Sequence, residues 1–360
     1  MKIAVLGSGN GGCAIAFDCA SHGHAVRLFD FETFPHNIRS VQSNGGIYAQ
    51  GELTGYAPIE YAGHQIEKAL HEAQVIFVVG PAYSTRPFAK ACQPHLQKGQ
   101  TVVVCPGSCG GSIAFKQEAG LDIRDETIIV AETSTLPYAV RLIEPGKIRI
   151  FLKLKGGIFL AAVPASNTPQ VMNKIQDIYP AMVTAKNVLQ TSLQNGNPVI
   201  HPAVTLLNAA LIERTGGDFL FYEDGVTPAV GRLIEAIDIE RAAIGKKLGV
   251  EVVPDPELGC LQGYMVEPTY ARGYAQAPGF KGIKAQNSLD YRYLNEDVGY
   301  GMVFMQNLGE QVGVDTPYMS AIIRLASLIM DRDYPGEARR TMASLGLATL
   351  TATELDRLLA

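Results

Sequence analysis

The sequence lacks several features that define whole classes of protein. No apolar run among its 360 residues approaches the length of a membrane-spanning helix. Its 35 Asp and Glu outnumber its 30 Lys and Arg, and the net charge of −5 argues against a nucleic-acid or anionic-membrane partner. No basic segment precedes the first apolar strand, so we expect neither secretion nor membrane insertion and predict a cytoplasmic protein. With 47% hydrophobic and 18% charged residues, the chain is typical of globular proteins and long enough for two domains.

Cysteine is scarce and shows no metal-binding pattern. The six cysteines have no C-x-x-C spacing, which predicts reduced and mostly buried thiols. Cys105 and Cys109 stand around a Pro-Gly turn without further ligands nearby. We therefore predict no metal site.

The opening stretch carries the strongest local pattern. Residues 3–6 form a short apolar run that predicts a strand buried on both faces. Gly7, Gly9 and Gly12 follow at G-x-G-x-x-G spacing, and residues 13–21 predict a helix. In a dinucleotide-binding turn the first glycine permits the tight turn, the second admits the pyrophosphate, and the third lets helix and strand pack closely. The free N–H groups of the helix would then face the phosphates.

A second predicted strand, residues 25–29, ends in Asp30, at about the distance expected for a carboxylate that binds the adenosine ribose. Because a carboxylate repels a 2′-phosphate, Asp30 favours NAD over NADP as the cofactor. The alternative is a strand-to-helix turn without a ligand, which this context disfavours. The predicted cofactor-binding residues of this region are Gly7, Gly9, Asn10, Gly11, Gly12 and Asp30.

Strand and helix patterns then keep alternating, which predicts a doubly wound parallel sheet. Strands over residues 75–79, 101–105 and 127–131 end next to Pro81 and Ala82, Pro106 and Gly107, and Glu132. Ligands of such sheets lie outside the carboxyl ends of the strands. These five residues are therefore candidate walls of a nicotinamide pocket, and the alternative is that they form ordinary turns.

The pattern changes after Arg141. Residues 147–155 and 158–163 predict an antiparallel hairpin turning at Gly156-Gly157, followed by a helix over 168–178 and a short strand over 182–184. Helical spacing of apolar residues then dominates, over residues 202–214, 226–248, 299–312 and 317–331. We predict an α/β protein, with a dinucleotide-binding Rossmann domain over residues 1–187 and an all-helical substrate domain over residues 188–360.

The predicted helical domain offers His201 as a candidate general acid/base. Pro202 suits the first turn of a helix and predicts that His201 lies near the helix start. The alternative is a structural histidine. Arg292 and Asp297 form a second candidate group, because an arginine fork can hold a carboxylate and an aspartate can orient a histidine. The same stretch can also be a loop in which Asn295 or Asp297 caps the following helix.

Longer motifs give the chain a resemblance to a known family. They are Gly9-Asn10-Gly11-Gly12, Asn197-Pro198-Val199-Ile200-His201-Pro202, Thr205-Leu206-Leu207-Asn208-Ala209-Ala210, Glu223-Asp224-Gly225-Val226-Thr227-Pro228 and Arg292-Tyr293-Leu294-Asn295-Glu296-Asp297-Val298. In these, and over nearly its whole length, the chain resembles the opine dehydrogenases (octopine and nopaline dehydrogenases), most closely the bacterial N-(1-carboxyethyl)-norvaline dehydrogenase type.

The resemblance implies a Rossmann domain and an all-helical domain with substrate in the cleft between them. It implies NADH-dependent reductive condensation of an α-amino acid with a pyruvate-like 2-oxo acid, and the reverse oxidation. His201 would be the catalytic acid/base, with its pKa held up by Asp297, while Arg292, Asn197 and Thr227 would bind substrate. Two departures bear on substrate identity. Tyr83 follows the loop after residue 80 where some relatives carry a histidine, and Cys105 and Cys109 flank Pro106-Gly107.

Other functions stay open at this point. A sibling dehydrogenase of a hydroxy acid or of glycerol 3-phosphate would share the architecture, but the latter family uses a catalytic lysine. Lys246 and Lys247 are predicted to face solvent on their helix instead. A non-catalytic nucleotide-sensing protein is a third alternative. The expected partners are small-molecule substrates and a second copy of the chain in a homodimer. One helical stripe has two interpretations, a dimer face or, as we favour, part of the core. It consists of Met319, Ile322, Ile323, Ala326 and Met330.

Overall fold

The computed structural model describes all 360 residues and divides into two compact units. Unit 1 comprises Met1–Thr191 and Leu358–Ala360, and unit 2 comprises Ser192–Arg357. The chain changes units inside helix α7 (Val188–Leu193), a few residues after the boundary that we predicted. The last helix, α17 (Ala352–Leu359), begins in unit 2 and ends in unit 1.

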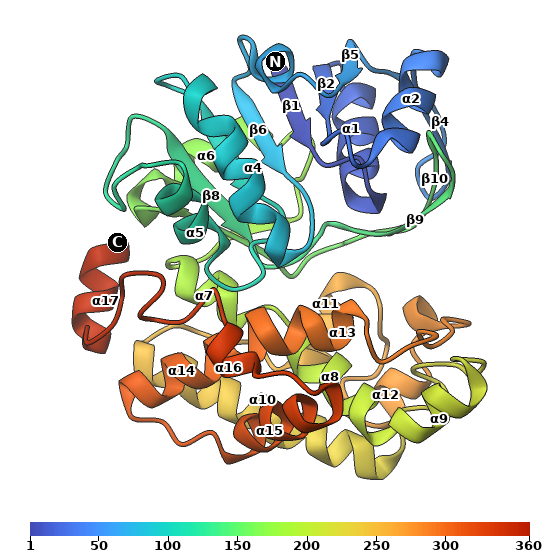
Figure 1. The fold of residues 1–360 in the computed structure, drawn as a ribbon, viewed down its shortest axis with the longest axis vertical. Coiled ribbons are helices and arrows are strands. Elements are labelled where there is room, and N and C mark those ends of the chain that lie inside the picture. Colours follow the sequence, from blue (N-terminus) through green and yellow to red (C-terminus); the bar gives the residue numbers. More distant parts are fainter. The chain divides into compact units, whose positions relative to one another are not determined.

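Unit 1 is built on an eight-stranded sheet in the order β12-β11-β8-β7-β6-β1-β2-β5 (Figure 1). Its strands run parallel except that β11 pairs antiparallel with β8. The doubly wound sheet predicted from the alternating pattern is therefore confirmed. The bounds are β1 (Lys2–Leu6), β2 (Ala25–Phe29), β5 (Tyr61–Gly63), β6 (Val75–Val78), β7 (Thr101–Val104), β8 (Ile129–Thr133), β11 (Ile158–Val163) and β12 (Met182–Thr184).

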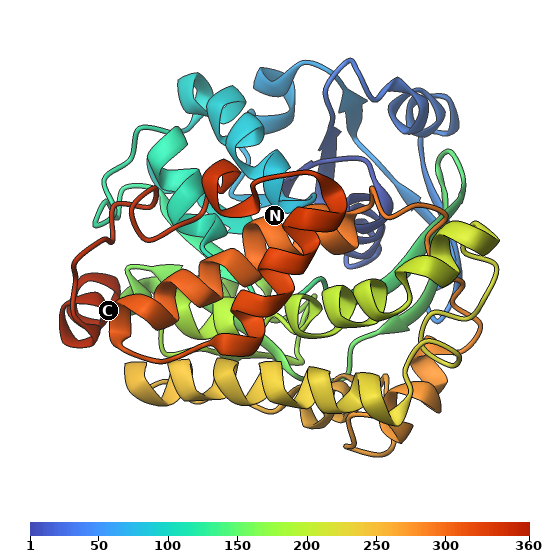
Figure 2. The same cartoon turned by 60° about the horizontal axis from the view of Figure 1, so that its bottom comes forward.

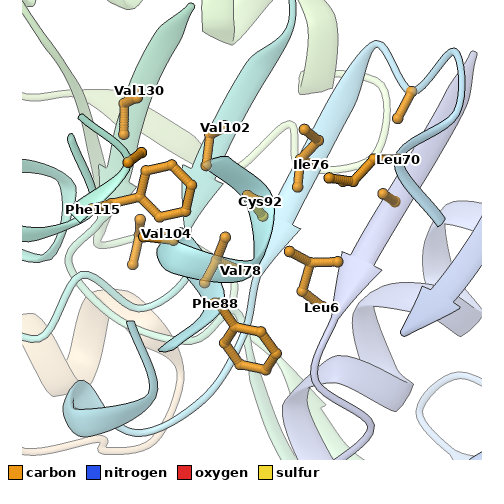
Figure 3. Close-up of a cluster of buried hydrophobic side chains, with 14 of the residues drawn as sticks. Leu6, Leu70, Ile76, Val78, Phe88, Cys92, Val102, Val104, Phe115 and Val130 are labelled. Atoms are coloured by element: carbon orange, nitrogen blue, oxygen red, sulfur yellow. The ribbon is translucent and has the colours of Figure 1, made fainter. Parts of the chain in front are cut away.

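The central strands lie in the interior because both of their faces are apolar. Every residue of β6 and β7 is buried, and Leu6, Val78 and Val104 from neighbouring strands meet Phe88 and Phe115 from the covering helices (Figure 3). Burying one such side chain stabilises the folded state by about 1.5–3 kcal/mol. This apolar layer therefore stabilises the sheet whose edge carries the candidate ligand site.

A second, four-stranded sheet in unit 1 corrects the predicted hairpin. Its order is β4-β3-β10-β9, with bounds β3 (Gly46–Gly51), β4 (Gly55–Pro58), β9 (Tyr138–Glu144) and β10 (Lys147–Lys153). We expected β10 to pair with β11 across Gly156-Gly157. Instead β10 pairs with β9 and β3, while β11 joins the main sheet. Sequence reasoning missed β9, whose turn at Gly146 makes the hairpin.

The helices of unit 1 cover the main sheet and include α1, which follows the glycine turn. We expected this helix to begin at residue 13, but it begins at Asn10, because its first turn accommodates Gly11 and Gly12. The bounds are α1 (Asn10–Ser21), α2 (Pro35–Asn44), α3 (Ile66–Leu70), α4 (Thr85–Cys92), α5 (Gly111–Glu118) and α6 (Thr168–Ile175), with short 3-10 turns η1 (Ala82–Ser84), η2 (Gln93–His95) and η3 (Ala165–Asn167).

Unit 2 is helical, as the apolar spacing predicted, and α10 is its longest helix, drawn in yellow in Figure 2. Helix α8 packs against α10, α13, η5 and α15. The bounds are α8 (Asn197–Leu207), α9 (Ala209–Thr215), α10 (Pro228–Leu248), α11 (Asp255–Gln262), α12 (Arg272–Ala275), α13 (Arg292–Asn295), α14 (Val303–Val312), α15 (Pro317–Met330) and α16 (Tyr334–Glu337), with a 3-10 turn η4 (Pro278–Phe280) and a π-helix η5 (Asp297–Met302).

Two expectations about exposed and buried surfaces are met in unit 2. Met319, Ile322, Ile323 and Ala326 of α15 are buried, so these four positions of the stripe are core, whereas Met330 at its end is half-buried. Lys246 and Lys247, in the last turn of α10, are exposed. No helix in either unit has the length and apolar character that crossing a bilayer requires.

Candidate functional site

The glycine turn between β1 and α1 shows why each of its glycines is needed. Gly7 has φ +110°, and a Cβ there would lie 2.0 Å from the carbonyl oxygen of Val79. A Cβ on Gly12 would lie 1.8 Å from the carbonyl oxygen of Gly7. Gly9 differs, because a Cβ at this position would meet no protein atom within 4 Å. The first and third glycines therefore serve packing, whereas the second leaves open space where a pyrophosphate would approach.

The N-terminus of α1 borders the same space. No side chain caps this helix, so the N–H groups of its first turn are available to an anion. The side chain of Asn10 is already engaged, because its Oδ1 accepts a hydrogen bond from the backbone N–H of Leu142 at 2.7 Å. Asn10 therefore joins the second sheet to the turn, and its Nδ2 and backbone N–H keep donor capacity for the predicted contact with cofactor.

Asp30 follows β2 and is joined to the glycine turn. Its Oδ2 accepts hydrogen bonds from the backbone N–H and the hydroxyl of Ser8, both at 2.7 Å, and its Oδ1 accepts one from the N–H of Phe31 at 2.9 Å. A carboxylate offers about four acceptor positions. Asp30 thus orders the turn and retains acceptor capacity for a ribose hydroxyl. Together with the open space at Gly9, the residues of unit 1 suit a dinucleotide.

Pro81 and Ala82 follow β6, and Pro106 and Gly107 follow β7, which is next to β6 in the sheet. Since β6 also neighbours β1, these turns lie on the sheet edge that carries the glycine turn. Glu132, in β8, is fully buried. Its predicted contact with the cofactor stays a prediction.

Both carboxylate oxygens of Glu132 are engaged with protein groups. Oε2 accepts hydrogen bonds from the N–H and hydroxyl of Ser112 at 2.8 Å, and Oε1 accepts one from the hydroxyl of Thr191 at 2.7 Å. In this structure Glu132 therefore joins β8 to α5 and α7.

His201 is placed by helix α8 of unit 2. The expectation that it lies near the helix start beside a first-turn Pro202 is wrong. The helix begins at Asn197, Pro198 occupies the first turn, and Pro202 lies inside the helix. Because Pro202 lacks an N–H, the helix forgoes one backbone hydrogen bond directly after His201. His201 is only 7% exposed, so its side chain lies in the interior of the unit.

Asp297 reaches His201 from the π-helix η5. Such π-helical turns are often found at functional sites. The close approach of η5 to α8 depends on Gly301, where a Cβ would lie 2.3 Å from Cγ of Pro198. The alternative that Asp297 caps the following helix is not observed, since no side chain caps η5 or α14. Its Oδ2 instead accepts a hydrogen bond from Nδ1 of His201 at 2.7 Å.

Two tyrosines complete the surroundings of the imidazole, and sequence reasoning missed the role of both. The hydroxyl of Tyr222 lies 3.1 Å from Nε2 of His201. The ring of Tyr293 stacks on the imidazole with centroids 3.9 Å apart. The only sequence signals were the aromatic pair Phe221-Tyr222 before the Glu223-Asp224-Gly225 motif and the place of Tyr293 next to Arg292.

The pKa of His201 is lowered below its ordinary value of 6.5, chiefly because burial disfavours the charged imidazolium. Asp297 opposes this shift through its charge and its hydrogen bond, and Arg292 adds a small lowering effect. The expectation that Asp297 holds up the pKa is therefore right for its own contribution and wrong for the net shift. The imidazole is predominantly neutral at pH 7, with the Nδ1 proton directed to Asp297.

Arg292 lies on α13, one turn before Asp297. Its Nε pairs with Oε2 of the buried Glu296 at 3.2 Å, while 42% of its side chain remains exposed. Burial lowers the pKa of the guanidinium, but the negative charges of Glu296 and Asp297 outweigh this effect and raise the pKa above its ordinary range, so the group stays charged. The structure thus brings Arg292, Asp297 and His201 into one electrostatic group with part of the arginine fork open to solvent.

The other two predicted substrate-binding residues lie at helix starts. Asn197 is the first residue of α8 and is half-buried. Thr227 is exposed and caps α10 by accepting a hydrogen bond from the N–H of Val230 at 3.4 Å. Their contact with substrate stays a prediction. No group of three or more His, Cys, Asp or Glu side chains in the structure is arranged to hold a metal ion.

Each of the two units matches a known protein family. The family model described as NAD/NADP octopine/nopaline dehydrogenase, alpha-helical domain, matches residues 184–330, and that of the NAD-dependent glycerol-3-phosphate dehydrogenase N-terminus matches residues 2–110. An opine dehydrogenase of Arthrobacter sp. (strain 1C) is 35% identical over 97% of this chain and 96% of its own. Protein ocs of Agrobacterium tumefaciens (strain Ach5) is 27% identical over 99% of both chains.

Solved structures show the same fold. Octopine dehydrogenase with NADH and L-arginine has a TM-score of 0.79 at 18% identity and covers 99% of this chain and 97% of its own. Yersinopine dehydrogenase with NADP+ has a TM-score of 0.71 at 15% identity over 99% and 97%. The full-length similarity to the Arthrobacter enzyme decides the family. The chain belongs to the opine dehydrogenases, which are NAD-dependent oxidoreductases.

Proposed function

We propose that the protein catalyses the NADH-dependent reductive condensation of an α-amino acid with a pyruvate-like 2-oxo acid, and the reverse oxidation. The observation that carries the proposal is the buried His201–Asp297 pair with Arg292 beside it. The reaction needs an acid/base and a cation that binds a carboxylate. His201, with its tautomer fixed by Asp297, is suited to the first role, and Arg292 is suited to the second. Relatives named for opine, tauropine and D-nopaline support the same reaction type.

We propose specific roles for the chain's residues. The glycine turn, the N-terminus of α1 and Asp30 of unit 1 would hold NADH, which would supply the hydride for the reduction. In unit 2, Arg292 binds a substrate carboxylate, with Asn197 and Thr227 as further substrate contacts. His201 exchanges the proton that converts the carbinolamine hydroxyl into leaving water, and Asp297 keeps its Nδ1 protonated. The carboxylate of Asp30 supports NADH over NADPH.

The decisive experiment follows NADH oxidation with pyruvate against a panel of amino acids. We expect an amino-acid-dependent rate that the matched His201→Asn variant loses by at least about 100-fold, because general acid/base catalysis contributes 10²–10⁴-fold. NADH binding by the variant should be unchanged. The absence of an amino-acid-dependent rate with any pair would refute the reaction, and NADH binding without any turnover would favour a nucleotide sensor.

A hydroxy-acid or glycerol-3-phosphate dehydrogenase is the second candidate. It is favoured by the match of residues 2–110 to the glycerol-3-phosphate dehydrogenase N-terminus. That match ends before unit 2, where the octopine dehydrogenase domain matches instead and where Lys246 and Lys247 face solvent. Oxidation of such an alcohol by NAD without an amine would establish this alternative.

We further propose a cytoplasmic homodimer. The six cysteines form no disulfide, which suits a reducing compartment. The buried stripe of α15 is not available as a dimer face, so the interface would use another surface. Sedimentation equilibrium of the purified protein tests the dimer, and a single monomeric species at micromolar concentration would refute it.

A further inference from the structure

Nε2 of His201 is the atom that must exchange the proton, and it is already covered. Asp297 accepts the hydrogen bond of Nδ1 at 2.7 Å, so in the neutral imidazole the proton resides on Nδ1 and the lone pair on Nε2. The one hydrogen-bond partner that the structure gives Nε2 is the Tyr222 hydroxyl at 3.1 Å. A reactant therefore meets Nε2 only by displacing Tyr222 or by acting through its hydroxyl.

Displacement is opposed by the packing of both rings. Tyr222 stacks on Phe280 with centroids 4.2 Å apart and planes 13° apart, and it meets Phe221 edge-on at 5.0 Å. His201 stacks on Tyr293. The two partners of the bond are only 5% and 7% exposed. Each aromatic contact contributes about 0.5–1.5 kcal/mol beyond burial, so neither ring rotates away without losing stacking energy.

The backbone that carries Tyr222 is also fixed. The N–H of Phe221 donates to the carbonyl of Ile283 at 2.8 Å, and Leu220 forms an antiparallel bridge with Lys284. Glu223 accepts a hydrogen bond from the N–H of Gly282 at 2.6 Å. The tyrosine is thus held on both sides in sequence, and its hydroxyl stays at Nε2.

We infer that Tyr222 is a proton relay between His201 and the reacting substrate, a role that rests on the proposed function. In the condensation, the C–O bond of the carbinolamine breaks with its electron pair going to oxygen while the nitrogen lone pair forms the C=N bond. The Tyr222 hydroxyl gives its proton to the departing oxygen, forming water, and takes the Nε2 proton of the His201 imidazolium. His201 ends neutral and Tyr222 unchanged. The reverse direction runs the same transfers backwards.

The surroundings of Tyr222 suit a concerted transfer. Burial raises the pKa of its hydroxyl well above the ordinary value, so a free phenolate is disfavoured near neutral pH. The hydroxyl must therefore gain one proton as it loses the other. The structure gives its oxygen no partner besides His201, which leaves a lone pair for a reactant.

The test is a double-mutant cycle with Tyr222→Phe and His201→Asn. Phenylalanine keeps the ring on Phe280 and removes only the hydroxyl. We expect kcat to fall at least about 30-fold, with the KM of both substrates and the Kd of NADH changed less than about threefold. The double variant should be no slower than His201→Asn alone, because both groups serve one proton path. The matched control is Tyr264→Phe, which removes a hydroxyl from the same aromatic stack and should keep kcat within about twofold.

Each outcome separates the relay from the underlying function. If His201→Asn keeps wild-type turnover, the proposed function of His201 fails and the relay with it. If His201→Asn is inactive but Tyr222→Phe keeps wild-type kcat, only the relay is overturned. Additive losses in the double variant would also overturn it. Should Tyr222→Phe fail to fold, the proton inventory of the wild-type kcat decides: a curved dependence on deuterium fraction indicates two protons in flight, and a linear one overturns the relay.

Discussion

Replacing Asp297 by asparagine tests the pairing on which the proposed chemistry depends. Asp297 is 2% exposed, and its Oδ2 accepts a hydrogen bond from Nδ1 of His201 at 2.7 Å. A hydrogen bond to a charged group contributes about 1.5–3 kcal/mol, and about 1.4 kcal/mol corresponds to a tenfold change in rate. We therefore expect kcat to fall about 10- to 150-fold. An asparagine that donates to Nδ1 would also reverse the tautomer and push the loss towards the upper value.

The same variant should move the pH profile in a defined direction. Asp297 is the group that raises the pKa of His201 against the effect of burial. Its removal lowers that pKa further, so the imidazolium that acts as the acid in condensation is lost at lower pH. The alkaline decline of kcat should therefore begin at lower pH in Asp297→Asn than in the wild type.

The assay is NADH consumption with saturating substrates over a range of pH, with Asp290→Asn as the matched control. Asp290 is exposed on the same segment and accepts a hydrogen bond from Asn295 at 2.7 Å, away from His201. The control removes the same charge and should keep the wild-type profile. If Asp297→Asn retains kcat within about threefold and its alkaline limb does not move, the reasoning is refuted.

Three further outcomes are expected. Gly9→Ala should keep the wild-type melting temperature yet weaken NADH binding at least about tenfold, because its Cβ meets no protein atom. Gly12→Ala should lose about 2 kcal/mol or more of unfolding free energy, because its Cβ collides with the backbone. Equal melting temperatures of the two variants would contradict this prediction. Arg292→Lys should raise the KM of the carboxylate substrate more than it lowers kcat, since an ammonium lacks the bidentate fork; an unchanged KM would remove Arg292 from substrate binding. The free energy of unfolding should fall as pH drops below 6.5, because the unfolded chain protonates His201 at a higher pH than the folded protein does. Urea unfolding at about pH 7.5 and 5.5 should show a smaller fall in this free energy for His201→Gln than for the wild type. An equal fall would contradict the prediction.

Much of unit 1 could be predicted because its signals are local. A turn that needs glycine at Gly7 and Gly12 declares itself in the sequence, since any side chain there collides with backbone. Strands buried on both faces are apolar throughout, as in β6 and β7. The hairpin error has the opposite origin. Besides β9, which directly precedes it, β10 pairs with β3, about a hundred residues earlier in the chain, and no local pattern encodes the pairing with β3.

The candidate site divides in the same way. The sequence by itself determined the dinucleotide turn, the helical second half and the candidates His201, Asp297 and Arg292, because residue type and motif carry them. Only the tertiary structure decided that His201 lies inside its helix, that burial outweighs Asp297 in setting its pKa, and that Tyr222 covers Nε2. Burial and hydrogen-bond partners are properties of neighbours in space, and helices and loops far apart in the chain supply them. The residue type of His201 therefore determines that it can exchange a proton, and the fold around it sets the pKa at which it does so.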